Sequence, residues 1–311
     1  MKRPPKFLYA TKWEVAAVKP LTGDASARKY FRLRQGNETA ILMDATRVRE
    51  IVAPFIQINR HLQQLGFSAP EIIASDDENG FLLLEDFGDE TFYQLLENNF
   101  DAEKLFALAT EVLIGLHKNP NAIPKDLRAY HPQKMLEDVE LFLEWHPVSE
   151  EGKAEFRTVW LETLPLAHQV PSSLLLRDYH VANLMLLPKR EGVRRAGLLD
   201  FQDAYQGPVT YDLVSLLEDA RRDLPPGLKE KMLARYISHF PNLDRKNFEI
   251  SMAILAALRH TRVLAIFEKL SREGKSDYKK LHSTRVERLL QDALRHPKLA
   301  ALKNWFAKYA R

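Results

Sequence analysis

The most informative part of this chain is the stretch Leu174-Leu-Leu-Arg-Asp-Tyr-His-Val-Ala-Asn183, followed by Leu198-Leu-Asp-Phe201. Asp178 follows an apolar run and precedes Asn183 by five positions, and Asp200 ends a later apolar run. A phosphoryl-transfer site arranges a base and two magnesium ligands in this order. Three residues in order can also match by chance, since two loop carboxylates and an Asn often form only Asx-turns.

The residues between these positions predict a β-hairpin. Residues 184–187 are apolar, residues 189–192 have the composition of a turn, and residues 193–199 return as a strand. Asn183 and Asp200 should then lie at the two open ends of one hairpin, close enough to share a metal ion. Residues 174–176 form a further short apolar run that ends at Asp178.

Each of these residues has a chemical role that suits phosphoryl transfer. Asp178 is the candidate general base, which would accept the proton of an attacking hydroxyl and aim its oxygen at phosphorus. Arg177 either keeps that carboxylate ionised or contacts other acidic groups. Asn183 and Asp200 offer the oxygen ligands that Mg²⁺ prefers, with phosphates and water completing the coordination.

Composition excludes several classes of site. The chain has 311 residues, of which 45% are hydrophobic and none is cysteine, so disulfides, zinc thiolate sites and thiol nucleophiles are ruled out. A net charge of +3 does not require nucleic acid or an anionic membrane as partner. No apolar run approaches the ~20 residues of a membrane span, and no signal peptide follows the basic N-terminus. We expect a soluble, cytoplasmic monomer.

The chain divides into a β-rich part and a helical part, so the predicted class is α+β. Residues 1–86 should form a small antiparallel sheet with one long helix over 47–65 that stops at Gly66, and residues 87–311 a larger, mainly helical lobe. The strands are predicted at residues 13–21, 29–34, 39–45, 72–74 and 81–85, and helices at 102–117, 132–145, 153–164 and 248–270, with nearly all of 211–311 helical.

Two segments of the β-rich part could hold a nucleotide. Between two predicted strands, the small residues around Gly23 would let backbone amides approach phosphates, Ser26 could donate to a phosphate oxygen, and Arg28 adds positive charge. An ordinary hairpin loop looks much the same. Residues 81–88 could pair extended backbone with an adenine edge while Leu84 supplies apolar contact, or they could be an ordinary buried strand.

Three further residues near the motif could bind the acceptor substrate or support the catalytic loop. Asp203 is a candidate for holding a substrate hydroxyl, and His180 could contact substrate, although a loop histidine is more often a packing group. Asp212 follows Gly207-Pro-Val-Thr-Tyr, where a helix is predicted to start. We interpret it as a structural group that accepts hydrogen bonds from the backbone of the catalytic loop rather than as a catalytic one.

These motifs resemble the aminoglycoside phosphotransferase family of kinase-fold small-molecule kinases over nearly the whole length. Within it they are similar to the bacterial kinases that phosphorylate the anomeric hydroxyl of N-acetylmuramic acid and N-acetylglucosamine during cell-wall sugar recycling, with ATP and Mg²⁺. The resemblance is carried by Gly23-Asp-Ala-Ser26, Phe81-Leu-Leu-Leu-Glu-Asp86, Arg177-Asp-Tyr-His180, Asp200-Phe-Gln-Asp-Ala204 and Tyr211-Asp212.

The resemblance implies a two-lobed, protein-kinase-like fold and a set of roles. Asp178 would be the base, Asn183 and Asp200 the metal ligands, and the backbone of Glu85 and Phe87 would pair with adenine.

One departure concerns the lysine that kinases usually place on the third strand. Met43 stands in that region, so Arg28 or Arg32 is our hypothesis for a substitute. Two alternatives remain open at this point. One is a kinase of another small alcohol, such as an aminoglycoside, choline, homoserine or a thiosugar, and the other is a nucleotide-binding pseudokinase.

Overall fold

The chain forms two compact units in a computed structural model that describes residues 5–9, 11–21 and 27–310. The first unit comprises Met1–Asp101 with Val181–Ala204, and the second comprises Ala102–His180 with Tyr205–Arg311. The junction expected near residues 86–90 thus lies within the first unit, which also takes in the segment that follows His180. The proposed division into functional lobes at residue 86 stays a prediction.

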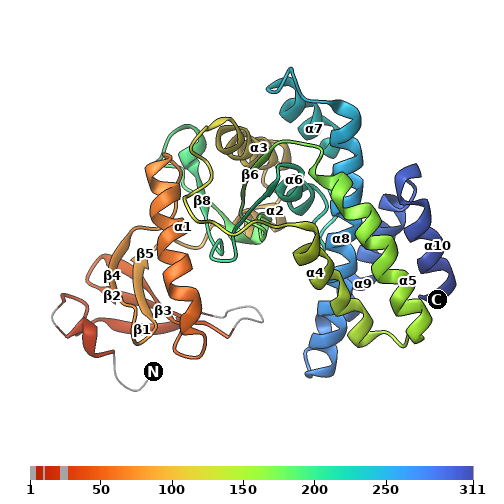
Figure 1. The fold of residues 1–311 in the computed structure, drawn as a ribbon. Helices are drawn as coiled ribbons and strands as arrows, with labels where there is room; N and C mark the ends of the chain where they lie inside the picture. The colour runs from red at the N-terminus through yellow and green to blue at the C-terminus, as the bar shows by residue number, and fades with distance from the viewer. Residues whose placement is uncertain (1–4, 10, 22–26, 311) are drawn as a thin grey trace. The chain divides into compact units, whose positions relative to one another are not determined.

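The first unit is built on an antiparallel sheet in the order β1-β2-β3-β5-β4 (Figure 1). A two-residue turn joins β2 to β3, with Gln35 opposite Glu38 and with Gly36 at φ +59°, a conformation that glycine adopts without strain. Four strands confirm the predicted ones closely, but the first is shorter, because residues 12–15 form turns. The strands are β1 Ala17–Leu21, β2 Lys29–Gln35, β3 Glu38–Asp44, β4 Ile72–Asp76 and β5 Phe81–Glu85.

The two faces of this sheet bury different partners. Because successive side chains of a strand point to opposite faces, alternate positions collect into two sets. One face packs on Leu8, the last residue of the short 3₁₀ helix η1 (Lys6–Leu8), and on Trp13. That face consists of Phe31, Leu33, Ala40, Leu42 and Leu83. The opposite face presents Tyr30, Arg32, Ile41 and Leu84, which line a cavity.

A single long helix covers the first unit's sheet. Helix α1 (Val52–Gln64) follows the 3₁₀ turn η2 (Arg49–Ile51) and ends before Gly66, at φ +85°, as the sequence predicted. Its ring of Phe55 stacks on Phe201 with centroids 5.0 Å apart, so the residue after Asp200 is anchored to this helix.

The predicted hairpin is present, with one strand shorter than expected. Strand β7 (Leu184–Leu186) pairs with β8 (Ala196–Leu198), joined through the 3₁₀ turn η5 (Gly192–Arg195). The strand predicted for residues 193–199 was therefore too long, because Gly192 adopts φ +53° and starts this turn. The apolar run before Asp178 is strand β6 (Ser172–Leu175) in the second unit, where it pairs with β9 (Tyr205–Pro208).

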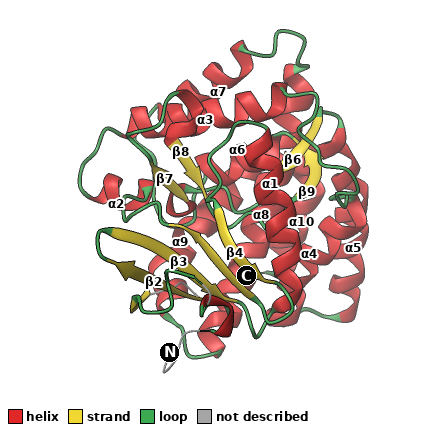
Figure 2. Ribbon diagram, turned by 90° about the vertical axis from the view of Figure 1, so that its left-hand side faces the viewer, coloured by secondary structure: helices red, strands yellow, loops and turns green. Residues whose placement is uncertain are grey.

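The second unit is mainly helical, as predicted (Figure 2). Helix α6 begins at Thr210 rather than at Gly207, because residues 205–208 pair with β6 as a strand that the sequence did not predict. Helix α2 (Phe92–Glu97) of the first unit was also missed. The helices are α3 Ala102–Lys118, α4 Pro132–Trp145, α5 Glu150–Thr163, α6 Thr210–Leu217, α7 Leu228–Ser238, α8 Arg245–Arg272, α9 Asp277–Ala293 and α10 Ala300–Tyr309, with the 3₁₀ segments η3 Leu164–His168, η4 Val181–Asn183 in the first unit, and η6 Pro297–Leu299.

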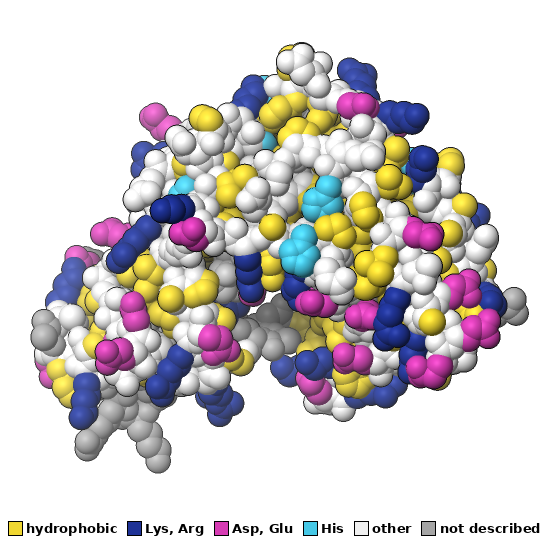
Figure 3. Space-filling model, viewed as in Figure 1, with side chains coloured by type: hydrophobic (Ala, Val, Ile, Leu, Met, Phe, Trp, Pro, Cys, Tyr) yellow, Lys and Arg dark blue, Asp and Glu magenta, His cyan; other side chains and the backbone are white. Residues whose placement is uncertain are grey.

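Helix α8 is the structural centre of the second unit. It packs against α4, α6 and α9, and in the described part of the chain it alone is long and apolar enough to span a membrane. Within its most apolar window 72% is buried inside the protein, as in the core helix of a soluble domain. On the face seen in Figure 3, acidic and basic side chains are interspersed, in keeping with 45 Lys and Arg against 42 Asp and Glu.

Candidate functional site

A cavity of about 410 Å³ in the first unit brings together most of the residues that the sequence singled out there. Its volume lies within the usual range for small-molecule sites. The walls come from β2, β3 and β5, from the segment after β5, and from the two open ends of the β7–β8 hairpin. The predicted residues that line it are Arg28, Arg32, Leu84, Glu85, Phe87, Asn183 and Asp200.

The hairpin is held against the cavity wall by close packing and by backbone hydrogen bonds. A Cβ on Gly197 would lie 2.8 Å from the ring of Phe87, so only glycine fits there. The N–H of Leu198 donates to Ser68 at 2.7 Å. Arg190 of the connecting turn pairs with Glu85 at 2.5 Å. The segment after β5 and the hairpin therefore form one connected wall.

Asn183 and Asp200 occupy neighbouring positions at the open ends of that hairpin, as predicted. Leu184 pairs with Leu198, and the N–H of Leu199 donates to the carbonyl of Asn183 at 3.0 Å. Asp200 has φ +60°, a conformation that is unusual for a residue with a side chain and that is common at functional sites. The two side chains offer an amide and a carboxylate oxygen, which fits a hard cation that takes its other ligands from phosphate and water. Among the described residues, no group of three or more His, Asp or Glu side chains could hold a metal ion.

Arg28 reaches the same carboxylate. Its Nη2 lies 2.5 Å from Oδ1 of Asp200, and its Nη1 donates to Gln202 at 2.8 Å. Burial opposes the charge of the guanidinium, but attraction by Tyr30 and Asp200 outweighs it and raises the pKa of Arg28. Arg28 is thus a fixed positive charge at the cavity end where Asp200 lies.

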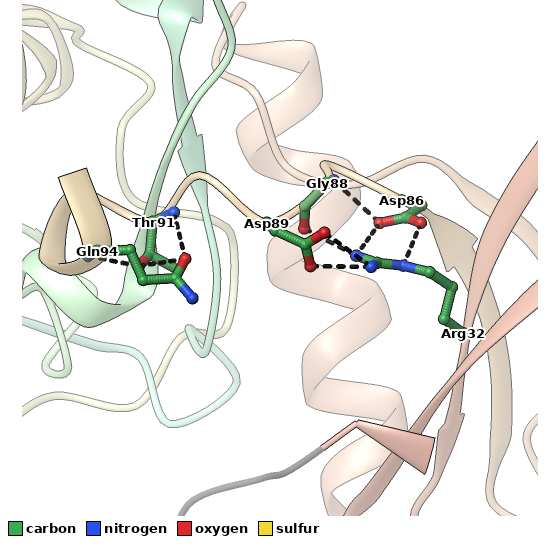
Figure 4. Close-up of polar contacts among 6 residues, drawn as sticks. All are labelled: Arg32, Asp86, Gly88, Asp89, Thr91 and Gln94. Carbon is green, nitrogen blue, oxygen red and sulfur yellow. Dashed lines mark hydrogen bonds and ion pairs between the residues drawn. The ribbon is translucent and has the colours of Figure 1, made fainter. Parts of the chain in front are cut away.

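Arg32 has a different environment, which Figure 4 shows. Its Nε lies 2.7 Å from Asp86, its Nη1 donates to Asp89 at 2.8 Å, and its Nη2 donates to the carbonyl of Gly88 at 2.9 Å. The guanidinium thus ties strand β2 to the segment that leaves β5. These contacts make Arg28 the better candidate for replacing the absent lysine, and the phosphate role of Arg32 stays a prediction.

The segment after β5 keeps backbone groups available for a ligand. Among the hydrogen bonds within the described part of the chain, none uses the N–H of Phe87. Leu84 is 4% exposed and lines the cavity beside it. The segment continues into α2, whose first turn is closed by a capping box between Thr91 and Gln94 (Figure 4).

In the second unit, Asp212 shapes the loop that carries Asp178. The carboxylate of Asp212 accepts from the backbone N–H of Leu176 at 2.6 Å and of Arg177 at 2.9 Å, which confirms the structural role that was predicted for it. Burial raises the pKa of Asp212 to about 7, although these two donors favour its charged form. Arg177 adopts φ +65°, so two buried hydrogen bonds hold a backbone conformation that side chains disfavour.

The charges around Asp178 come mainly from helix α8. Burial opposes ionisation, yet the guanidinium groups of Arg259 and Arg262 outweigh it and lower the pKa of Asp178. Arg177 contributes less, because its side chain turns to Asp138, at 2.5 Å. Burial, together with repulsion from Arg221, lowers the pKa of the neighbouring His180 to about 4.

The remaining predicted residues are placed as follows. Asp203 is an exposed residue of the first unit, and Gln202 donates to it at 3.3 Å, whereas His180 is buried in the second unit. Gly23 and Ser26 lie outside the described residues.

The sequence reasoning missed Asp138, Arg259 and Arg262. All three lie on helices far along the chain from Asp178, and their surroundings there look like an ordinary amphipathic pattern. The only sequence signal is an arginine pair three positions apart on an otherwise apolar helix, where a charged residue needs a partner.

Comparison with known proteins shows the family of this chain. The model of a family described as "Phosphotransferase enzyme family" matches residues 17–247. A protein of Caulobacter vibrioides named N-acetylmuramate/N-acetylglucosamine kinase is 32% identical, covering 97% of this chain and 94% of the relative. A protein of the same name from Pseudomonas aeruginosa is 33% identical over 96% of this chain and 91% of the relative.

Solved structures show the same fold at lower identity. A choline/ethanolamine kinase family protein from Mesorhizobium loti superposes with a TM-score of 0.64 at 15% identity, covering 92% of this chain and 91% of the other. The choline kinase LicA from Streptococcus pneumoniae gives a TM-score of 0.64 at 16% identity over 89% and 93%, and a further LicA structure is a complex with AMP. The kinase-like α+β fold is therefore confirmed, and the chain belongs to the phosphotransferase enzyme family.

Proposed function

We propose that this protein transfers the γ-phosphoryl group of ATP to the anomeric hydroxyl of N-acetylmuramic acid and N-acetylglucosamine. The observation that carries the proposal is the cavity in which Asn183, Asp200 and Arg28 converge, in a chain whose near full-length relatives are kinases of these two sugars. Phosphoryl transfer asks the protein mainly for positioning and charge stabilisation, which is what this set of side chains can supply.

The nucleotide would lie in the first unit's cavity. Adenine would pair with the backbone of Glu85 and Phe87 and rest on Leu84, at the wall where the N–H of Phe87 has no partner within the described chain. Arg28 would attract the phosphates. Asn183 and Asp200 would hold Mg²⁺, which when bound neutralises the charge of the phosphate oxygens.

Asp178 would receive the proton of the sugar hydroxyl. A carboxylate whose pKa is lowered is ionised at neutral pH but is a weak base, so its contribution should be to orient the hydroxyl and to accept the proton late in the transfer. Asp212 supports this by fixing the backbone of the two preceding residues, Leu176 and Arg177. His180 and Asp203 stay candidates for contacts with the sugar.

A polycationic acceptor such as an aminoglycoside is less well supported. Such an acceptor needs an acidic pocket, for which the sequence offers four carboxylates, Asp203, Asp212, Glu218 and Asp219. In the second unit three of these are buried: Asp212 holds the loop backbone, Glu218 pairs with His260 at 2.6 Å, and Asp219 accepts from the N–H of Arg221 at 2.9 Å. Choline and homoserine stay open as smaller acceptors.

A pseudokinase is the second alternative. It is motivated by Met43, which is fully buried where kinases usually present a lysine. The presence of Asp178, Asn183 and Asp200, together with Arg28 in the cavity, argues against it. We further propose that the enzyme is a cytoplasmic monomer that recycles cell-wall sugars.

Product analysis tests the proposal directly. The protein is incubated with ATP, Mg²⁺ and N-acetylmuramic acid, and the product is examined by mass spectrometry and by its loss of reducing power, which reports the anomeric position. Asp178→Asn should lower turnover on the order of 10²- to 10⁴-fold while nucleotide binding persists, and the exposed-turn control Asp77→Asn should match the wild type. A mass increase of one phosphate without loss of reducing power would reject the anomeric position, and near-native turnover of Asp178→Asn would reject the base.

Magnesium is tested by titration. Asp200→Asn removes one charged oxygen ligand, so we expect activity at saturating ATP to require a higher Mg²⁺ concentration, by on the order of tenfold. An unchanged Mg²⁺ dependence would place the metal elsewhere.

A further inference from the structure

Three arginines gather around the loop that carries Asp178 in the second unit. We call Arg177, Arg259 and Arg262 the arginine cluster. Arg259 and Arg262 are three positions apart on α8, so they lie on neighbouring turns of the same helix face. The Nη1 of Arg259 donates to the backbone carbonyl of Arg177 at 3.3 Å, directly before Asp178.

Two of these arginines have structural partners. Arg177 donates to Asp138, and its guanidinium lies 4.7 Å from the ring centre of Tyr130. Arg259 is 6% exposed and serves the loop backbone. Each is therefore committed to holding the loop.

Arg262 is different. Its guanidinium pairs with Asp138 only at 3.8 Å, which is too long for a hydrogen bond. Oδ2 of Asp138 already accepts from Arg177 at 2.5 Å and from Tyr130 at 2.8 Å. The side chain of Arg262 is 28% exposed. A guanidinium carries five N–H donors in a planar fork that matches a carboxylate, and here its ion pair with Asp138 is long and leaves the side chain partly exposed.

Arg262 also lies close enough to Asp178 for their charges to interact, and this attraction contributes to the lowered pKa of Asp178. An acceptor whose hydroxyl meets Asp178 would therefore place its other groups near Arg262. The two sugars of the proposed function differ in one respect that matters here. N-acetylmuramic acid carries a lactyl ether with a carboxylate on the same ring as the reacting hydroxyl, and N-acetylglucosamine carries a hydroxyl there.

We infer that Arg262 binds the lactyl carboxylate of N-acetylmuramic acid and thereby sets the preference of the enzyme between its two sugars. The inference rests on the proposed function and deepens it. A two-pronged guanidinium–carboxylate pair in a partly desolvated site is among the stronger polar contacts. This pair would also explain how a site with Asp178 at its centre can accept an anionic sugar. Without Arg262, the carboxylates of Asp178 and of the lactyl group would repel each other.

The test compares two sugars on one variant. Arg262→Met keeps the length and apolar stem of the side chain but removes its charge. We expect kcat/KM for N-acetylmuramic acid to fall about 10- to 100-fold more than kcat/KM for N-acetylglucosamine, mainly through KM, because any effect on Asp178 is common to both sugars. Arg262→Lys should lie between the wild type and Arg262→Met, because the charge remains and the fork is lost. Arg235→Met, on the surface of α7, is the matched control.

The neutral sugar serves as an internal control for folding. A parallel measurement with the methyl ester of N-acetylmuramic acid should show a weak substrate whose kcat/KM falls in Arg262→Met by no more than that of N-acetylglucosamine. An equal loss for both sugars would mean that Arg262 acts on Asp178 or on the fold, and no loss for either would mean that Arg262 does not bind the carboxylate. Either result overturns the inference and leaves the proposed function standing. If the wild type phosphorylates neither sugar, the proposed function falls and the inference falls with it.

Discussion

Nη2 of Arg28 lies 2.5 Å from Oδ1 of Asp200, so the cation that we assign to the nucleotide phosphates pairs with the carboxylate that we assign to the metal. Arg28 lies directly before strand β2 and Asp200 lies at the open end of the hairpin, 172 positions apart in the chain. The pairing supplies each of these half-buried charges with a partner of opposite charge when no ligand is bound. When Mg²⁺ and ATP bind, both residues have new partners of opposite charge.

The first prediction concerns Arg28. Two cationic side chains line the described part of the cavity, Arg28 and Arg32, and Arg32 is engaged with Asp86 and Asp89. Arg28→Ala therefore removes the cation that is better placed to attract phosphates. We expect kcat/KM for ATP to fall about 10- to 100-fold, equivalent to roughly 1.4–2.7 kcal/mol of transition-state stabilisation. Steady-state kinetics with varied ATP measures it, and the exposed Arg34→Ala on the following strand, β2, is the control. Unchanged KM and kcat would show that another group replaces the lysine.

The second prediction concerns the ties made by Arg32. Arg32→Gln breaks the contacts with Asp86, Asp89 and the carbonyl of Gly88, so the segment after β5 should become more mobile. We expect KM for ATP to rise about tenfold with little change in kcat, because the adenine site loosens and the reacting groups do not. Amide hydrogen exchange of residues 86–91 should accelerate in the same variant. A fall in kcat with unchanged exchange would instead indicate direct contact between Arg32 and phosphate.

The third prediction concerns Asp212. In Asp212→Asn the amide oxygen can accept from one of the two backbone N–H groups of Leu176 and Arg177, and the amide NH₂ must face the other. Leaving one buried donor unsatisfied should lower the free energy of unfolding by about 1–3 kcal/mol. Urea unfolding followed by circular dichroism measures the loss. Turnover should fall as well because the loop of Asp178 loses its support, and a fully stable but inactive variant would assign Asp212 to the chemistry.

The fourth prediction concerns pH and the buried His117. Burial lowers the pKa of His117 to about 3, and its ring Nδ1 lies 2.7 Å from the hydroxyl of Tyr236. In the unfolded chain the group takes up a proton near pH 6.5, whereas in the folded chain it stays neutral until about pH 3. The unfolded state therefore binds more protons than the folded state as the pH falls. This residue alone should lower the free energy of unfolding by about 2 kcal/mol between pH 7 and pH 5.

Comparison with a variant isolates the contribution of this histidine. His117→Asn is expected to be less stable than the wild type at pH 7, since packing is lost, but its unfolding free energy should decline less steeply toward pH 5. His180, with its pKa lowered to about 4, acts in the same direction and remains in both proteins. Equal pH slopes for the two proteins would mean that His117 is protonated in the folded state.

The sequence alone predicted the parts of the fold that depend on local pattern. Alternating residues located the strands of the sheet, and the apolar spacing located α1, α3, α4 and α8, because period and capping are local properties. The order of Asp178, Asn183 and Asp200 predicted phosphoryl transfer, which the family of the chain confirms, while the roles of the three residues stay a prediction. The extra strand β9 was missed because its pairing with β6 is not local.

Only the tertiary structure decided which charges serve these groups. Arg28 and Asp200 are 172 residues apart, and Arg262 reaches Asp138 across more than a hundred residues. A guanidinium on a helix reads the same in sequence whether it faces water, a carboxylate or a substrate. Its role depends on what the fold places within a few ångströms, because electrostatic attraction falls with distance and with exposure to water.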